Sequence, residues 1–132
     1  MRETSVDNRT RKVFVIDDDP MIRRALERLL RSAGYEVETF GSAEAFLARE
    51  PLPMEGTVLL DVRMSKMNGP ALQQHLAATD HHLSIYFITA DDDPRTRAAA
   101  LAAGARGWFP KPLDGEALLA ALRPADASAA SS

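Results

Sequence analysis

The chain of 132 residues is long enough for one domain with a single hydrophobic core, and 45% of its residues are hydrophobic. Its net charge of −3 argues against sequence-independent nucleic-acid binding and against a basic helix that lies on a membrane surface. The lack of Cys excludes disulfides, thiol catalysis and zinc–thiolate sites, and it suits the cytoplasm, which is the expected location. No apolar run approaches the ~18 residues that span a bilayer.

Segments with strand and helix character alternate along the chain. The first stretch, 1–11, is polar and is expected to be a mobile leader rather than a secretory signal. Strands rich in β-branched and aromatic residues are predicted at 12–16, 35–40, 57–61, 83–89 and 107–109. A helix is predicted after each strand, and the helices begin at the N-cap residues Asp19, Ser42, Asp93 and Asp114 and at Pro70.

The repeated alternation of strand and helix indicates an α/β fold. Such a pattern predicts a parallel sheet with helices on both faces and right-handed crossovers. The domain is expected to span 12–122, and the Ala- and Ser-rich stretch 123–132 is expected to be a disordered tail or the stub of a linker. In sheets of this kind, ligands bind beyond the carboxyl ends of the strands.

Polar residues with compatible chemistry end four of the predicted strands. The apolar strand 57–61 ends in Asp61, and the first strand runs into Asp17 and Asp18. Thr89 ends the fourth strand, and Lys111 follows the fifth. Each residue alone has an ordinary interpretation, as a solvated acid, a strand residue or a surface lysine. Because the carboxyl ends of parallel strands meet at one edge of a sheet, we expect these side chains to lie together.

Three carboxylates at one edge repel one another and need a cation between them. Two like charges about 4 Å apart cost about 4 kcal/mol at an effective dielectric constant near 20. No His or Cys is expected nearby, so the ligands are oxygens, which favours Mg²⁺, or Mn²⁺ in its place, over Ca²⁺. Lys111 adds a fixed positive charge and Thr89 a hydroxyl donor. A metal and an amine that face a carboxylate suit phosphoryl transfer, with Asp61 as the acceptor.

The chain resembles a known family, the receiver domain of two-component response regulators, over 12–122. The matching segments are Val13-Phe14-Val15-Ile16-Asp17-Asp18-Asp19, Leu59-Leu60-Asp61-Val62-Arg63-Met64, Phe87-Ile88-Thr89-Ala90 and Pro110-Lys111-Pro112. This motif set is specific in its order and spacing. The resemblance implies a flavodoxin-like (βα)5 fold with a five-stranded parallel sheet in the order 2-1-3-4-5.

The resemblance also implies a role for each residue at the edge of the sheet. Asp61 is expected to be the phosphoacceptor, and Lys111 to pair with Asp61 and then with the phosphoryl group. Asp18, Asp61 and the backbone carbonyl of Arg63 are expected to bind Mg²⁺, with Asp17 acting through a bound water. The phosphoryl group is expected to come from the phosphohistidine of a sensor histidine kinase and to be lost by slow hydrolysis.

Two positions depart from the family pattern, and both concern the response to phosphorylation. Thr89 is expected to move toward the phosphoryl group, and Trp108 to follow by changing rotamer. The family usually has Phe or Tyr at the position of Trp108, so this larger ring turns less easily or stays outward as a binding surface; its alternative role is a core anchor. Ser65 replaces the usual Pro in the loop 62–70, which has an expected turn at Asn68-Gly69.

Residues just beyond the strand ends are expected to line a pocket over Asp61. Met64 and the small residue Ala90 are expected on its wall. Arg63 and Asp91 each lie two residues past a site residue, so we expect them to form an ion pair that partly covers Asp61 and sets the phosphoryl lifetime. In the acidic run 91–93, Asp93 is expected to cap a helix and the other two to be solvated. The arginines of the first helix are expected to form a solvated face or a docking surface for an acidic partner: Arg23, Arg24, Arg28 and Arg31.

The favoured function is a phosphorylation switch rather than an enzyme. The expected partners are a sensor histidine kinase and a downstream effector or missing output domain, with no direct binding of nucleic acid or membrane. The surface of the fourth helix, fifth strand and fifth helix is expected to bind a partner, and a second copy of the domain is one candidate. Two alternatives stay open: a pseudo-receiver that only binds partners, and a haloacid-dehalogenase-like phosphatase, whose nucleophile belongs at the end of the first strand.

Overall fold

The computed structural model describes residues 12–79 and 81–123, so the expected leader 1–11 and the stretch 124–132 lie outside the described residues. Strands and helices alternate throughout this part of the chain, as the sequence predicts. The elements are β1 (Lys12–Ile16), α2 (Pro20–Ser32), β2 (Glu36–Phe40), α3 (Ala43–Leu47), β3 (Glu55–Asp61), α4 (Gly69–Ala77), β4 (His82–Thr89), α5 (Pro94–Ala102), β5 (Gly107–Pro110) and α6 (Gly115–Leu122).

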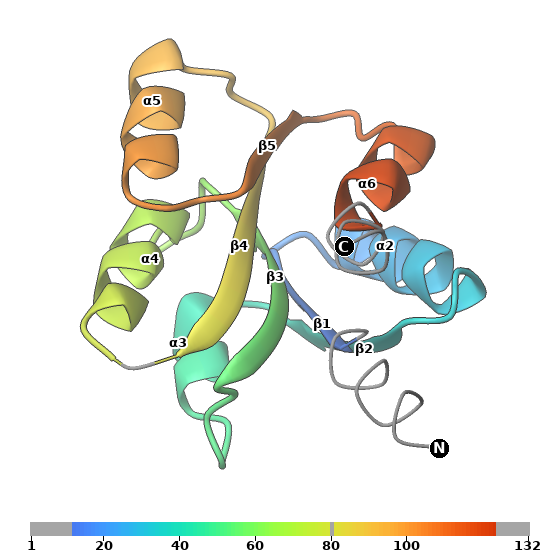
Figure 1. Ribbon diagram of the computed structural model, residues 1–132, viewed down its shortest axis with the longest axis horizontal. Coiled ribbons are helices and arrows are strands. Elements are labelled where there is room, and N and C mark those ends of the chain that lie inside the picture. Colours follow the sequence, from blue (N-terminus) through green and yellow to red (C-terminus); the bar gives the residue numbers. More distant parts are fainter. Residues whose placement is uncertain (1–11, 80, 124–132) are drawn as a thin grey trace, which may run out of the picture.

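The five strands form one parallel sheet in the order β2-β1-β3-β4-β5, which confirms the predicted topology (Figure 1). The central strand β3 pairs with β1 on one side and β4 on the other, with Leu59 opposite both Val15 and Tyr86. Because every strand runs the same way, the ends of β1, β3, β4 and β5 all lie at one edge of the sheet.

Alternate residues of each strand face opposite sides of the sheet, so each side has its own apolar core. Phe14, Leu60 and Phe87 face α3, α4 and α5, which cover one side. Val15 and Leu59 face the other side, where α2 and α6 pack through Leu30 and Leu118 among others. Figure 1 shows these two layers of helices to the left and right of the sheet. A sheet covered on both faces has nearly continuous apolar strands, which is the pattern in β3 and β4.

Polar caps start the helices where the sequence predicts them. The side-chain oxygen of Asp19 accepts a hydrogen bond from the backbone N–H of Met21 at 2.9 Å, and Asp93 accepts one from Arg95 at 3.0 Å. Ser42 and the carboxylate of Asp114 cap α3 and α6 in the same way. An N-cap of this kind is worth about 1 kcal/mol.

A cluster of charged residues joins β1, β2 and the segment just after α3. The guanidinium of Arg49 donates two hydrogen bonds of 2.7 Å to the carboxylate of Glu38, and the Nζ of Lys12 lies 2.9 Å from the same group. These contacts, of which the bond from Arg49 is the strongest, lower the pKa of Glu38 to about 2. The cluster therefore contributes to stability as long as Glu38 is ionised.

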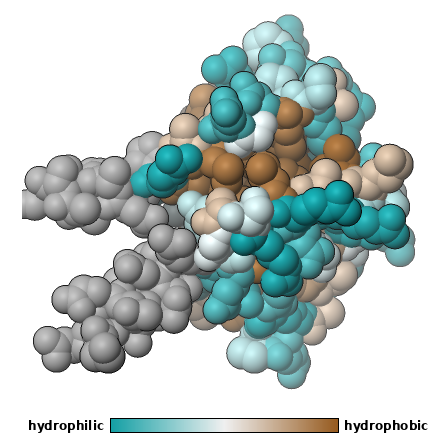
Figure 2. Space-filling model, turned by 90° about the vertical axis from the view of Figure 1, so that its right-hand side faces the viewer, coloured by the Kyte–Doolittle hydropathy of each residue, from teal (hydrophilic) through white to brown (hydrophobic). Residues whose placement is uncertain are grey.

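The two helices α2 and α6 lie side by side on one face of the molecule. Gly115, the first residue of α6, faces the side chain of Leu29, which a Cβ at position 115 would approach to 3.2 Å. Figure 2 shows this side, where apolar residues gather near the centre with hydrophilic residues above and below. None of the helices in the described ranges has the length and apolar character needed to cross a membrane.

Candidate functional site

Asp17, Asp18 and Asp61 meet at the carboxyl edge of the sheet, as the sequence predicts. Each offers a carboxylate oxygen, and these oxygens all lie within 4.8 Å of one another. The Nζ of Lys111, just past β5, lies 2.9 Å from Oδ2 of Asp17 and 3.6 Å from Oδ1 of Asp61. Lys111 was expected to pair with Asp61, but its nearer partner here is Asp17.

Burial of the carboxylates in this cluster raises the free energy of their charged forms. Asp17 is completely buried and Asp61 is 4% exposed, whereas Asp18 lies at the surface. Desolvation, and after it the charge of Asp17, raise the pKa of Asp61 to about 7 against the opposing effects of Lys111 and the backbone N–H of Arg63. Burial lowers the pKa of Lys111, but the carboxylates of Asp17 and Asp61 outweigh it, so the pKa is raised. The single ammonium of Lys111 thus faces the two buried carboxylates of Asp17 and Asp61.

The donor set fits a divalent cation. Oδ1 of Asp17 accepts a hydrogen bond from the backbone N–H of Asp19 at 2.9 Å. Its buried Oδ2 receives no hydrogen bond from any described residue, although the ionic contact with Lys111 is close. A buried anionic oxygen without a hydrogen bond is costly unless a further positive group satisfies it. Three carboxylates without His or Cys form the type of site that hard cations such as Mg²⁺ prefer.

Arg23 of α2 holds the loop that carries Asp17 and Asp18. Its Nη1 donates a hydrogen bond to the backbone carbonyl of Asp17 at 2.7 Å, and Arg23 is half-buried. The expected solvated face is therefore wrong for this arginine, while Arg24 and Arg28 are exposed. The signal in the sequence was its position four residues after the cap Asp19, which returns the side chain to the level of the loop.

The loop after β3 is shaped by a close backbone contact rather than by the expected turn at Asn68-Gly69. Asn68 is the N-cap of α4, and its side chain accepts a hydrogen bond from Ala71 at 2.9 Å. Gly69 begins the helix, where a Cβ would lie 2.4 Å from the carbonyl oxygen of Asp61. The left-handed residue of this loop is Lys66, with φ of 65°. Gly69 is therefore required because its backbone touches the end of β3.

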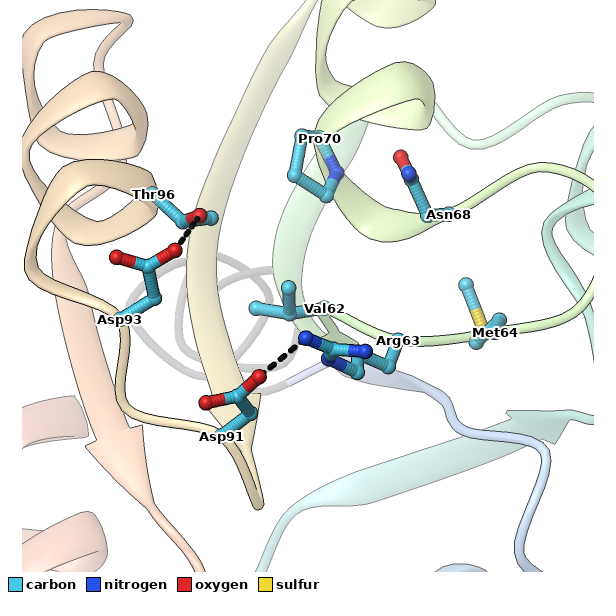
Figure 3. Close-up of a pocket in the computed structure, with 8 residues that line it drawn as sticks. All are labelled: Val62, Arg63, Met64, Asn68, Pro70, Asp91, Asp93 and Thr96. Atoms are coloured by element: carbon cyan, nitrogen blue, oxygen red, sulfur yellow. Dashed lines mark hydrogen bonds and ion pairs between the residues drawn. The ribbon is translucent and has the colours of Figure 1, made fainter.

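A pocket of about 330 Å³ opens between the loop after β3, α4 and the start of α5, and Asp61 is not one of the residues that line it. Arg63 and Asp91 form the expected ion pair across it and point toward one another (Figure 3). The pocket is lined by Val62, Arg63, Met64, Asn68, Pro70, Asp91, Asp93 and Thr96. Met64 is on this wall as expected, whereas Ala90 is exposed and is not one of the lining residues.

Comparison with known proteins decides which family this site belongs to. Residues 13–123 match the response regulator receiver domain. The chain belongs to this family. It is 37% identical over 120 residues to the response regulator protein TodT of Pseudomonas putida, covering 91% of this chain and 53% of TodT.

Two further relatives agree with this assignment. The transcriptional regulatory protein TdiR of Thauera aromatica is 38% identical over 125 residues, which cover 95% of this chain and 55% of TdiR. The structure of the response regulator StyR superimposes with a TM-score of 0.77 at 46% identity, covering 86% of this chain and 57% of StyR. The receiver domain thus spans about half the length of the curated relatives it matches.

Thr89 of this receiver is bonded to the loop between β4 and α5. Thr89 is completely buried, and its Oγ1 donates a hydrogen bond to the backbone carbonyl of Asp91 at 2.9 Å. The same oxygen accepts a bond from the backbone N–H of Asp91 at 3.0 Å. In this structure the hydroxyl of Thr89 therefore stabilises the loop after β4, and it has to give up its bond to the carbonyl of Asp91 before it can donate to a group on Asp61.

Trp108 of the receiver lies inward, so the alternative of an outward ring is wrong for this structure. It is 9% exposed and packs against Phe87, with ring centroids 5.9 Å apart. Its Nε1 donates a hydrogen bond to Oδ1 of Asp92 at 2.7 Å. Asp91 and Asp92 are exposed, as expected for solvated residues, and each also has a side-chain partner. Which of three successive Asp residues meets which partner depends on loop conformation, which the sequence pattern does not reveal.

Proposed function

We propose that this receiver domain, residues 12–122, is a phosphorylation switch in which Asp61 accepts a phosphoryl group from the phosphohistidine of a sensor histidine kinase. One observation carries this proposal: the oxygens of Asp17, Asp18 and Asp61 lie within 4.8 Å of one another, and Lys111 lies beside them. No structural need explains gathering these charges at the edge of a sheet, and phosphoryl transfer needs such a set.

The metal proposed for this site is Mg²⁺, or Mn²⁺ in its place. Asp18, Asp61 and the backbone carbonyl of Arg63 would hold it, and Asp17 would act through a bound water. When bound, the ion supplies positive charge that neutralises the oxygens of the phosphoryl group. The all-oxygen donor set and the excess of carboxylates over the single ammonium of Lys111 support this assignment.

The residues of the chain supply the rest of the chemistry. A carboxylate oxygen of Asp61 attacks the phosphorus, the bond from phosphorus to the imidazole nitrogen breaks, and the imidazole takes the electron pair. Lys111 favours the ionised form of Asp61 that this attack requires, and its ammonium is then available to the phosphoryl oxygens. Thr89 would exchange its bond with Asp91 for one to a phosphoryl oxygen. The domain thus assists its own modification, and we expect no turnover of a separate substrate.

Of the two alternative functions, the phosphatase and the pseudo-receiver, only the pseudo-receiver calls for an experimental test. Membership of the receiver family sets aside the haloacid-dehalogenase-like phosphatase, whose nucleophile belongs after the first strand. A pseudo-receiver that only binds partners would have no need for Lys111 beside two buried carboxylates. Failure of Asp61 to take up a phosphoryl group would favour this second alternative.

The output of the switch is proposed to lie outside the receiver. Since this chain spans about half of TodT and TdiR, an output domain or a separate effector is expected to respond to it. TdiR is named a transcriptional regulatory protein, so a transcriptional output is the favoured one. We expect the face formed by α5, β5 and α6 to bind the partner or a second copy, in the cytoplasm and without direct contact to nucleic acid.

Mass spectrometry of the intact chain tests the function. Incubation with acetyl phosphate and Mg²⁺ is expected to add one phosphoryl group to the wild-type chain. The variant Asp61→Asn, and the wild type in EDTA, are expected to gain none. An unmodified wild type under conditions that label a known receiver, or equal labelling of Asp61→Asn, would overturn the proposal.

A further inference from the structure

The loop between β3 and α4, residues 62–68, keeps one residue in a backbone conformation that its side chain disfavours. Lys66 has φ of 65°, in the left-handed region, where a residue with a Cβ is strained. Every other residue with a positive φ in the described ranges is a glycine. The loop contains no proline that would fix its backbone. A strained conformation persists only where the surrounding structure holds it, so this loop depends on contacts with the rest of the protein.

Different bonds hold the base and the far part of this loop. At the base, the backbone N–H of Gly69 donates to the carbonyl of Val62 at 3.0 Å. Directly after the strained Lys66, the backbone N–H of Met67 donates to Oε2 of Glu44 at 3.2 Å. Glu44 belongs to α3 and lies 23 residues earlier in the chain than Met67. The far part of the loop is therefore bound to another element of the fold.

The helix α3 gives Glu44 a fixed position from which to hold the loop. The cap of this helix is Ser42, whose hydroxyl accepts a hydrogen bond from the backbone N–H of Ala45 at 3.0 Å. Phe46 of the same helix is completely buried, which anchors α3 to the core. Glu44 is exposed, so its carboxylate reaches the loop at the surface. A hydrogen bond to a carboxylate is stronger than one between neutral groups.

The same loop carries residues of the site at the end of β3. Figure 3 shows Arg63, Met64 and Asn68 along it. The backbone N–H of Arg63 donates to Oδ1 of Asp61 at 3.3 Å, a long hydrogen bond that restrains the start of the loop only weakly. A backbone carbonyl binds a metal ion well only if neighbouring contacts fix the orientation of its peptide group. The contact of Glu44 with the far part of the loop supplies such a restraint.

We propose that Glu44 is a positioning residue for the Mg²⁺ site, because it holds the loop 62–68 in its strained form and so fixes the direction of the Arg63 carbonyl. The part that concerns Mg²⁺ rests on the proposed function. Without the carboxylate of Glu44, Lys66 moves toward a negative φ, and the peptide groups around it turn. The loop then has to become ordered when Mg²⁺ binds, which lowers the affinity for the ion.

Hydrogen exchange at the amide of Met67, followed by NMR on the full chain without metal, tests the hold on the loop. Glu44→Ala is expected to speed this exchange roughly fivefold. Glu44→Gln loses the charge but keeps a side-chain oxygen that accepts the bond, and it is expected to remain close to the wild type. The matched control is Glu116→Ala, which removes an exposed acid from the same position of α6. Wild-type exchange in Glu44→Ala, or equally fast exchange in Glu44→Gln, overturns the role of the bond.

Titration with Mg²⁺, followed by the chemical shifts in the same spectra, tests the link to the site. Glu44→Ala is expected to bind Mg²⁺ roughly fivefold more weakly, whereas Glu44→Gln and Glu116→Ala keep the wild-type affinity. Unchanged affinity in Glu44→Ala, although its Met67 amide exchanges faster, overturns the positioning of the metal site.

The rate of phosphorylation by acetyl phosphate separates positioning from a general loss of stability. In Glu44→Ala this rate is expected to fall at limiting Mg²⁺ and to return to the wild-type value at saturating Mg²⁺, because the ion-bound loop is ordered in both proteins. An equal fall at both concentrations would contradict the proposal. If the wild type binds no Mg²⁺ or gains no phosphoryl group, the proposed function fails and the positioning of the metal fails with it. The exchange of the Met67 amide still decides whether Glu44 holds the loop.

Discussion

Replacement of Asp61 by Asn is expected to stabilise the metal-free domain at neutral pH. Burial, together with the charge of Asp17, raises the pKa of Asp61 from an ordinary value of 3.8 to about 7. The folded protein therefore holds this proton more tightly than the unfolded chain does. Ionisation of Asp61 then reduces the free energy of unfolding, and Asn removes that cost while keeping the shape of the side chain.

The pH dependence of this effect follows from the sign of the pKa shift. A shift of about three pKa units corresponds to at most about 4 kcal/mol, and we expect about 2 kcal/mol because Asp17 and Asp61 titrate together. A raised pKa in the folded state means that the wild type has its full stability below pH 3.8 and loses it as the pH rises toward about 7. The advantage of Asp61→Asn is therefore absent near pH 4, grows between about pH 4 and 7, and is constant above that range.

Thermal unfolding in EDTA, followed by circular dichroism across this pH range, measures the effect. The expected gain in Tm at about pH 8 is roughly 10 °C for a domain of this size. Asp18→Asn is the matched control, because it removes an exposed carboxylate of the same cluster and is expected to give a smaller gain. Asp61→Asn would refute the reasoning if it were less stable than the wild type at about pH 8, or if its gain were the same at about pH 4.

Three further predictions concern residues around the site and the charged cluster on β2. Arg63→Ala and Asp91→Ala each break the ion pair between these two side chains and are expected to change the rate of dephosphorylation severalfold. A time course of phosphoprotein loss measures this rate. Unchanged rates in both variants would contradict the role of the ion pair. Arg23→Ala frees the backbone carbonyl of Asp17 and is expected to weaken Mg²⁺ binding about tenfold by tryptophan fluorescence titration, whereas the exposed Arg24→Ala keeps the wild-type affinity. Glu38→Gln is expected to lower the free energy of unfolding by about 1 kcal/mol at neutral pH, after allowance for solvent screening. The contact with Arg49 lowers the pKa of Glu38 in the folded protein to about 2. The stabilising contribution of Glu38 is therefore present above pH 4.5 and is lost as the pH falls toward 2. Urea unfolding at both ends of that pH range checks the last prediction, and a pH-independent difference would count against it.

The order of elements and the edge of the sheet at which the site lies could be predicted because they depend on patterns within the sequence. The apolar strand that ends in Asp61 and the alternation of strands with capped helices determine that parallel strands deliver their last residues to one edge. The topology brings Asp17, Asp18, Asp61 and Lys111 together at that edge and places Thr89 at the end of β4 beside them in the chain order of the sheet.

The partners of individual side chains could not be predicted in the same way. Asn68 followed by Gly69 reads equally well as a turn or as a helix start, because both use the same residue types; only the contact of Gly69 with the end of β3 distinguishes them. The position of Arg23 four residues after Asp19 places its side chain at the level of the loop, but nothing in the sequence indicates that its acceptor is the backbone carbonyl of Asp17. The bond between Asp92 and Trp108 depends on the conformation of a loop and on the rotamer of a ring.

The most direct test of the central claim locates the phosphoryl group on the chain. After incubation with acetyl phosphate and Mg²⁺, the acyl phosphate is reduced with borohydride, and the digested protein is sequenced by mass spectrometry. The modified residue is predicted to be Asp61, with Asp17 and Asp18 unmodified and with no product in EDTA. Modification of another residue instead of Asp61, or an equal yield without the metal, would contradict the account.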